Sequence, residues 1–123
     1  MKPLSSFFRS FVFAARGIET VWREERSFQV QVIGALCVTI LMFLFELKSW
    51  EYVTIAILMA MVLVLEILNT VVERFVDMVK PRMHSYVGAI KDMMAGAVLI
   101  MSVTAAIVGV IIFFPHVALI VIQ

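Results

Sequence analysis

Three apolar runs, at residues 30–47, 53–72 and 93–114, set the strongest limit on how this chain can fold. Each holds about 20 residues, the length that an α-helix needs to cross about 30 Å of hydrocarbon. The chain has 123 residues, 63% of them hydrophobic, with a mean hydropathy of +1.08. This composition is typical of a membrane protein rather than of a soluble domain. The sequence therefore predicts an all-α membrane protein, one domain over residues 1–123 with three transmembrane helices.

Basic residues lie almost entirely on one side of the predicted membrane. Of the ten Lys and Arg residues, all but Lys48 belong either to the segment before the first span with its junction, or to the region from Arg74 to Lys91. The positive-inside rule then places the N-terminus and the second connection in the cytoplasm, and the first turn and the C-terminus outside. The net charge of +1 leaves no broad basic surface, so we expect no nucleic acid partner.

Residues 4–26 form an amphipathic segment before the first span. Their apolar side chains recur at steps of three and four, the spacing of one helical stripe: Leu4, Phe7, Phe8, Phe11, Ala15, Ile18 and Trp22. Basic residues recur every seven positions and so line one side of the helix: Lys2, Arg9, Arg16 and Arg23. The two stripes predict a helix that lies in the headgroup layer of a membrane. A soluble helix packed on a partner is the alternative.

Acidic and amide side chains appear where the second span approaches the cytoplasm. Glu66, Asn69, Glu73 and Asp77 fall within roughly 80° of one another on a helix, so they share one face. Ionisable groups at membrane depth are unfavourable and usually face a protein interior or a wet cavity. This acidic face is therefore a functional-site hypothesis. The alternative is one bundle whose acids reach outward to water.

The predicted topology brings other charged residues to the same cytoplasmic layer. Glu25 lies at the end of the amphipathic segment, and Lys91 and Asp92 precede the third span. Carboxylates from separate helices suit a hard cation such as Mg²⁺, which takes oxygen ligands and keeps some of its waters. Asp92 also has a purely structural interpretation, because a carboxylate favours a helix start. Lys91 could equally be a membrane anchor.

Two acids of the face are expected to have different roles. Glu66 and Glu73 are separated by about 10 Å of helix rise, too far to chelate one ion together. We expect Glu73, nearer the interface, to bind the metal ion with Glu25. Glu66 is deeper and drier, which suits a group that abstracts a proton.

Turn residues define the expected helix ends. Pro81 is expected to end the second transmembrane helix, and Gly88 to allow a turn within a polar loop that extends to Asp92. Pro115 and His116 are expected to interrupt the third span. Small residues on the spans permit close helix packing: Ala56, Ala60, Ala95, Gly96, Ser102, Ala106 and Gly109. Because three helices cannot enclose the acidic face, we expect a homo-oligomer.

Two stretches resemble one known family. Residues 66–73, with the sequence EILNTVVE followed by Asp77, and residues 91–99, with the sequence KDMMAGAVL, resemble the prokaryotic diacylglycerol kinase and undecaprenol kinase family. The resemblance extends over nearly the whole chain. It implies a homotrimeric integral membrane kinase that transfers the terminal phosphate of ATP to a lipid alcohol with Mg²⁺, at a site shared between neighbouring protomers. It also implies a multi-pass protein of the bacterial cytoplasmic membrane.

The resemblance also implies roles for individual residues. Glu66 resembles the catalytic base with Asn69 beside it, and Glu25 and Glu73 resemble the metal ligands. The positions that resemble nucleotide contacts are Asp77, Lys91 and Asp92, with Gly88 and His84 in the adjacent loop.

The sequence departs from the diacylglycerol kinase branch at several positions. Gln29 and Gln31 replace an arginine and a glutamate, and Ser6 replaces a basic residue. We expect Arg9, with Arg16, to supply the missing charge and to contribute to nucleotide binding. The AGAVL sequence after Asp92 is more similar to the undecaprenol kinase branch, so the lipid is undecaprenol or diacylglycerol with a preference for the first. A small proton-coupled transporter that uses Glu66 is the alternative function.

Overall fold

Four helices make up the part of the chain that the computed structural model describes, which is residues 2–80, 82 and 84–123. They are α1 (Lys2–Glu24), α2 (Arg26–Leu44), α3 (Ser49–Val79) and α4 (His84–Ile122). Within those residues there is no strand, and α2, α3 and α4 are each long and apolar enough to cross a membrane. The predicted all-α fold, with an amphipathic first helix and three spans, is confirmed.

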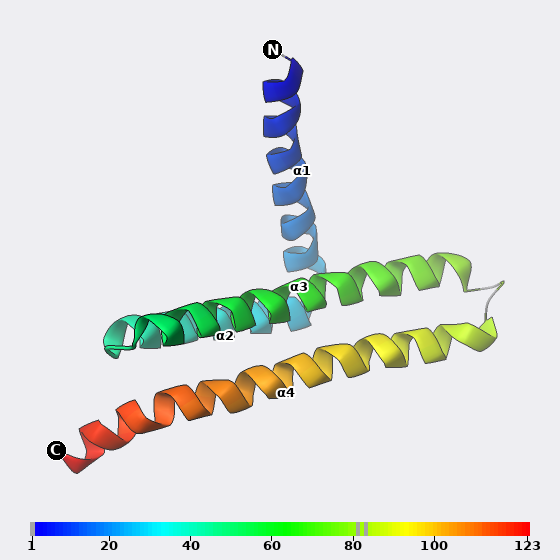
Figure 1. Ribbon diagram of the computed structural model, residues 1–123. Coiled ribbons are helices and arrows are strands. Elements are labelled where there is room, and N and C mark those ends of the chain that lie inside the picture. The colour runs from blue at the N-terminus through cyan, green and yellow to red at the C-terminus, as the bar shows by residue number, and fades with distance from the viewer. Residues whose placement is uncertain (1, 81, 83) are drawn as a thin grey trace.

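The four helices are arranged as a narrow bundle with one helix set across it. Helix α3 packs mainly against α4, which runs antiparallel to it, and less against α2. Helix α1 stands crosswise to the other three, and its N-terminal half extends away from them (Figure 1). If α2, α3 and α4 cross a membrane, this orientation lays α1 along the membrane surface. The exposed aromatic side chains of α1, among them Phe7, Phe8 and Phe11, fit that position.

A single extended residue separates α1 from α2. Glu25 has φ −114° and ψ 107°, so the two helices meet at a corner instead of forming one continuous rod. The Glu25 side chain does not cap the first turn of α2. The corner therefore leaves the Glu25 carboxylate available to other partners.

Helices α3 and α4 extend well past α2. With 19, 31 and 39 residues, α2, α3 and α4 have lengths of about 28, 46 and 58 Å at 1.5 Å per residue. Figure 1 shows the end of α3 and the beginning of α4 projecting together beyond the level of α1. We call residues 70–79 and 84–95 the projecting hairpin. It carries polar residues of both helices to one end of the molecule.

The helices differ from the predicted spans at this hairpin. Helix α3 continues beyond residue 72 to Val79, and α4 begins at His84, so Gly88 and Asp92 lie inside a helix. The predicted turn at Gly88 and the polar loop up to Asp92 are wrong. A glycine inside a helix costs only about 1 kcal/mol, and the two helices can offset this by packing against each other. Pro81, the expected end of the second span's helix, lies outside the described residues.

The predicted interruption of the third span is also wrong. Helix α4 runs through Pro115 and His116 and ends at Ile122. Proline removes one backbone hydrogen bond, but a helix end within hydrocarbon would leave several backbone groups without partners. Continuing the helix is therefore the less costly solution.

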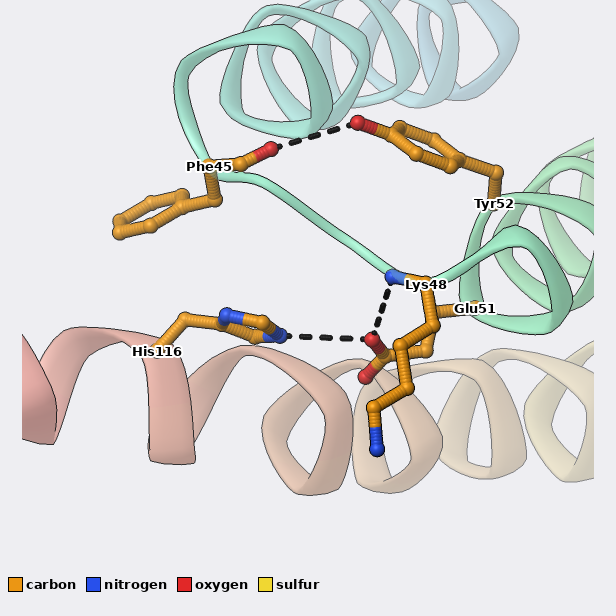
Figure 2. A network of polar contacts seen from close by, with 5 residues as sticks. All are labelled: Phe45, Lys48, Glu51, Tyr52 and His116. Atoms are coloured by element: carbon orange, nitrogen blue, oxygen red, sulfur yellow. Dashed lines mark hydrogen bonds and ion pairs between the residues drawn. The ribbon is translucent and has the colours of Figure 1, made fainter.

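The bundle is held together at the end opposite the projecting hairpin. Met42, Ile55 and Ile112, one from each spanning helix, form a buried apolar cluster. Beside it, the carboxylate of Glu51 accepts a hydrogen bond from the backbone N–H of Lys48 at 2.8 Å (Figure 2). The Tyr52 hydroxyl donates to the backbone oxygen of Phe45 at 3.3 Å. These contacts fix the turn between α2 and α3.

Candidate active site

The acidic face predicted on α3 is present, and its burial decreases toward the end of the helix. Glu66 is buried, with 5% of its surface exposed. Asn69 and Glu73 are half-buried, and Asp77 in the projecting hairpin is exposed. The structure thus gives the four residues three different environments along one helix.

Glu66 is held by the beginning of α2. The hydroxyl of Ser27 donates a hydrogen bond to Oε2 of Glu66 at 3.1 Å, across 39 residues of sequence. The nearby hydroxyl of Thr70 donates instead to the backbone oxygen of Glu66, at 3.1 Å. Ser27 was not among the predicted site residues. Its only signal in the sequence was its place two residues after Glu25.

Helix α1 reaches the same region of α3 through an ion pair. The carboxylate of Glu24 pairs with the guanidinium of Arg74, and both side chains are about half exposed. Glu25 and Glu73 are the immediate sequence neighbours of these two residues. The ion pair therefore brings the two backbone segments that carry the expected metal ligands next to each other.

The donor set near this ion pair fits Mg²⁺ bound together with phosphate oxygens. Asn69 Nδ2 donates to Glu73 Oε1 at 3.3 Å, which orients that carboxylate. Among the described residues, no group of three His, Cys, Asp or Glu side chains is placed to hold a metal ion. Mg²⁺ at phosphate-binding sites, however, is usually held by one or two carboxylates, with waters and substrate phosphates completing the shell. The carboxylates of Glu25 and Glu73 would suffice in number and in chemistry for such a site.

The projecting hairpin places a lysine beside the outer end of the acidic face. Lys91 Nζ lies 2.9 Å from Asp77 Oδ1, so α4 contributes a cation to this face of α3. Asp92 and Gly88 are exposed on the first turns of α4. The backbone of His84 begins α4, but its side chain lies outside the described part.

Arg9 is the site residue that the structure keeps apart from the others. It is exposed and belongs to the N-terminal half of α1, which extends away from α2, α3 and α4 (Figure 1). Within one chain, therefore, Arg9 does not join the cluster formed by α2, α3 and α4.

Comparison with known proteins identifies the family. Residues 12–113 match the family model described as prokaryotic diacylglycerol kinase. The chain belongs to the prokaryotic diacylglycerol kinase family. It is 42% identical over 112 residues to the undecaprenol kinase of Bacillus subtilis, covering 91% of both chains. It is 31% identical to a diacylglycerol kinase of Synechocystis, over 86% of this chain and 61% of the relative. It is also 26% identical to the Escherichia coli diacylglycerol kinase, over 85% of both chains.

The resemblance found in the sequence is thereby confirmed at the level of the family. Within the prokaryotic diacylglycerol kinase match lie the corner at Glu25, the acidic face of α3 and the first turns of α4. Arg9 lies before residue 12, where the match begins. The matched residues therefore include every predicted site residue except Arg9.

Proposed function

We propose that this protein is a membrane-embedded lipid kinase that transfers the γ-phosphate of ATP to the hydroxyl of undecaprenol or diacylglycerol. The observation that carries the proposal is the buried carboxylate of Glu66, held by Ser27 at the level where α1 crosses the bundle. Family membership supports the kinase class. It also favours a kinase over the proton-coupled transporter considered from the sequence.

In the proposed reaction Glu66 acts as the general base. It takes the proton from the lipid hydroxyl as the hydroxyl oxygen attacks the γ-phosphorus. The bond between that phosphorus and the β,γ-bridging oxygen breaks, and ADP leaves with the electron pair. Glu66 lies on α3, a candidate membrane span, and only 5% of its surface is exposed. In this proposal its carboxylate meets the lipid hydroxyl near the cytoplasmic end of that span. Positioning and charge neutralisation account for most of the catalysis in such transfers.

Glu25 and Glu73 are the proposed ligands of Mg²⁺, which when bound neutralises charge on the phosphates. Asn69 orients Glu73 through its 3.3 Å hydrogen bond, so we assign Asn69 a positioning role. The Glu24–Arg74 ion pair keeps the corner between α1 and α2 against α3. This contact brings the backbone on either side of the proposed metal site together.

The proposed nucleotide site is the projecting hairpin. Lys91 presents an ammonium group for phosphate oxygens, and Asp77 holds that group at 2.9 Å. Gly88 and Asp92 lie on the first turns of the same helix, and His84 starts it. Arg9 contributes in this proposal only if a neighbouring protomer presents it, because its own chain keeps it apart.

We propose a homotrimer as the functional assembly. Within the described residues, the backbones of α2 and α4 do not approach each other closely, although their side chains meet in the cluster of Met42, Ile55 and Ile112. Between these two helices, over α3, lies an apolar groove of about 260 Å³ that is lined in part by small residues, among them Gly34, Ala35, Ser102, Ala106 and Gly109. Small residues allow helices of other copies to approach closely. The proposed location is the bacterial cytoplasmic membrane, with α1 and the projecting hairpin in the cytoplasm.

The deciding experiment offers labelled ATP and Mg²⁺ to purified protein in detergent micelles with undecaprenol or diacylglycerol. We expect label in a lipid phosphate, with undecaprenol preferred because the 42% identical relative is named an undecaprenol kinase. Glu66→Gln keeps the shape of the side chain and should lower turnover by at least about 100-fold. Its oligomer in cross-linking should match that of the wild type. No label in either lipid would contradict the kinase proposal, and full turnover by Glu66→Gln would contradict the base.

A further inference from the structure

Ser27 occupies a position between two proposed parts of the site. It lies in the first turn of α2, two residues after Glu25, and its hydroxyl donates to Oε2 of Glu66 at 3.1 Å. The exposed surface of Glu66 is only 5%, whereas Ser27 is exposed, so this hydrogen bond joins a buried carboxylate to a residue at the surface of the chain. A hydrogen bond to a charged acceptor is stronger than one between neutral groups.

Two other polar side chains near Glu66 donate hydrogen bonds to acceptors other than its carboxylate. Thr70 donates to the backbone oxygen of Glu66 rather than to its carboxylate. Asn69, one turn along α3, donates to Glu73. Within the described residues, Ser27 is therefore the side chain whose hydroxyl fixes the Glu66 carboxylate.

We propose that Ser27 is a positioning residue for the phosphoryl transfer, which orients Glu66 for proton abstraction. This inference rests on the proposed function. A glutamate side chain has three rotatable bonds, and the hydrogen bond to Oε2 restricts their rotation. Oε1 is then left to receive the proton of the lipid hydroxyl. Small errors in the placement of a reacting group can lower a rate by up to about 100-fold.

The position of Ser27 also links the base to the metal site. Ser27 and Glu25 belong to the same short segment at the corner between α1 and α2, while Glu66 and Glu73 lie on α3. A movement of the corner would shift the Glu66 contact and the Glu25 ligand together. The start of α2 thus fixes the position of the proposed base, Glu66, relative to one proposed metal ligand, Glu25.

The test compares Ser27→Ala with Ser27→Thr and Ser27→Cys in the labelled ATP assay. For Ser27→Ala we expect kcat to fall by at least about tenfold. The KM for ATP should stay within about twofold of the wild-type value. Ser27→Thr keeps the hydroxyl and should restore most of kcat. Ser27→Cys should not, because a thiol is a weak donor.

Ser10→Ala is the matched control. This substitution also removes a serine hydroxyl. In the wild type that hydroxyl donates only to the backbone oxygen of Ser6, in the same helix, at 3.1 Å. The kcat of Ser10→Ala should equal that of the wild type. Thermal unfolding of every variant in detergent separates positioning from a structural role. If kcat of Ser27→Ala falls only in proportion to the loss of folded protein, the positioning role is wrong.

Wild type and Glu66→Gln in the same assay separate this inference from the proposed function. If the wild type phosphorylates lipid, Glu66→Gln does not, and Ser27→Ala has wild-type kcat, only the role of Ser27 is wrong. If the wild type is inactive, the kinase proposal fails, and if Glu66→Gln has full turnover, the base role of Glu66 fails. In either case the role of Ser27 fails with it. If Ser27→Ala selectively lowers kcat and Ser27→Thr restores it, the result supports both the proposed function and the positioning role of Ser27.

Discussion

Nε2 of His116 lies 3.4 Å from Oε1 of Glu51, so the last part of α4 is joined to the first turn of α3 (Figure 2). The same oxygen accepts the backbone N–H of Lys48 at 2.8 Å. Glu51 is 6% exposed, and a buried carboxylate is stable only when it is paired and hydrogen-bonded. This contact lies at the end of the bundle opposite the candidate active site. We therefore assign it a structural role.

Glu51→Ala is expected to lower the free energy of unfolding by about 1–2 kcal/mol, because it removes a helix cap and the partner of His116. Kinase activity of the folded fraction should not change. Thermal unfolding in detergent micelles measures the effect. Glu46→Ala is the matched control, because Glu46 lies in the same turn but is exposed. Equal losses for both variants would contradict the structural role of Glu51.

Lys91→Ala is expected to raise the KM for ATP by about tenfold or more, because the variant lacks the cation proposed to bind phosphate. Its ion pair with Asp77 is partly exposed, so losing the pair should change the stability of the fold little. ATP titrations of the labelled-lipid assay measure the change. Lys48→Ala removes a lysine at the other end of the bundle and should leave the KM unchanged. An unchanged KM in Lys91→Ala would exclude Lys91 from the nucleotide site.

Glu73→Gln is expected to raise the Mg²⁺ concentration needed for half-maximal rate by about tenfold or more, because a neutral amide is a poorer ligand of a hard cation. High Mg²⁺ should restore much of the rate. Glu19→Gln is the control, since Glu19 is exposed on α1 and pairs with Arg23. The assignment of Glu73 would be wrong if both variants had the Mg²⁺ dependence of the wild type.

Gly88→Ala tests whether the glycine serves nucleotide binding and not the stability of the fold. A Cβ at Gly88 would meet no other atom within 4 Å, and alanine favours a helix over glycine by about 0.5–1 kcal/mol. The variant should therefore unfold at a higher temperature. If the nucleotide approaches the backbone there, the KM for ATP should rise several-fold. A more stable variant with unchanged KM would remove Gly88 from the nucleotide site.

The spans and the acidic face could be predicted from the sequence because hydropathy and helical periodicity are local properties. Apolar runs gave α2, α3 and α4, and the spacing of Glu66, Asn69, Glu73 and Asp77 placed them on one face. The errors at Gly88 and Pro115 arose because both residues were given their usual turn and breaker roles. Packing of α3 on α4, and the cost of ending a helix in hydrocarbon, override those preferences.

Contacts between helices could not be predicted in the same way. The hydrogen bond from Ser27 to Glu66 spans 39 residues, and nothing in the local pattern around Ser27 indicates it. The pairing of His116 with Glu51 likewise depends on how α4 lies against the α2–α3 turn. The predicted topology placed Lys91 and Asp92 in the cytoplasmic layer, and the family resemblance implied that they contact the nucleotide. The structure then provided the contact of Lys91 with Asp77.

The short length of α2 makes this protein sensitive to hydrophobic mismatch. Helices α3 and α4 are long enough to tilt or project in bilayers of different thickness, whereas the 19 residues of α2 barely match the hydrocarbon layer. A thicker bilayer would draw the start of α2, with Ser27, toward the lipid and away from its alignment with Glu66. Turnover is therefore expected to depend on the acyl chain length of the host lipid, which sets the thickness of the hydrocarbon layer.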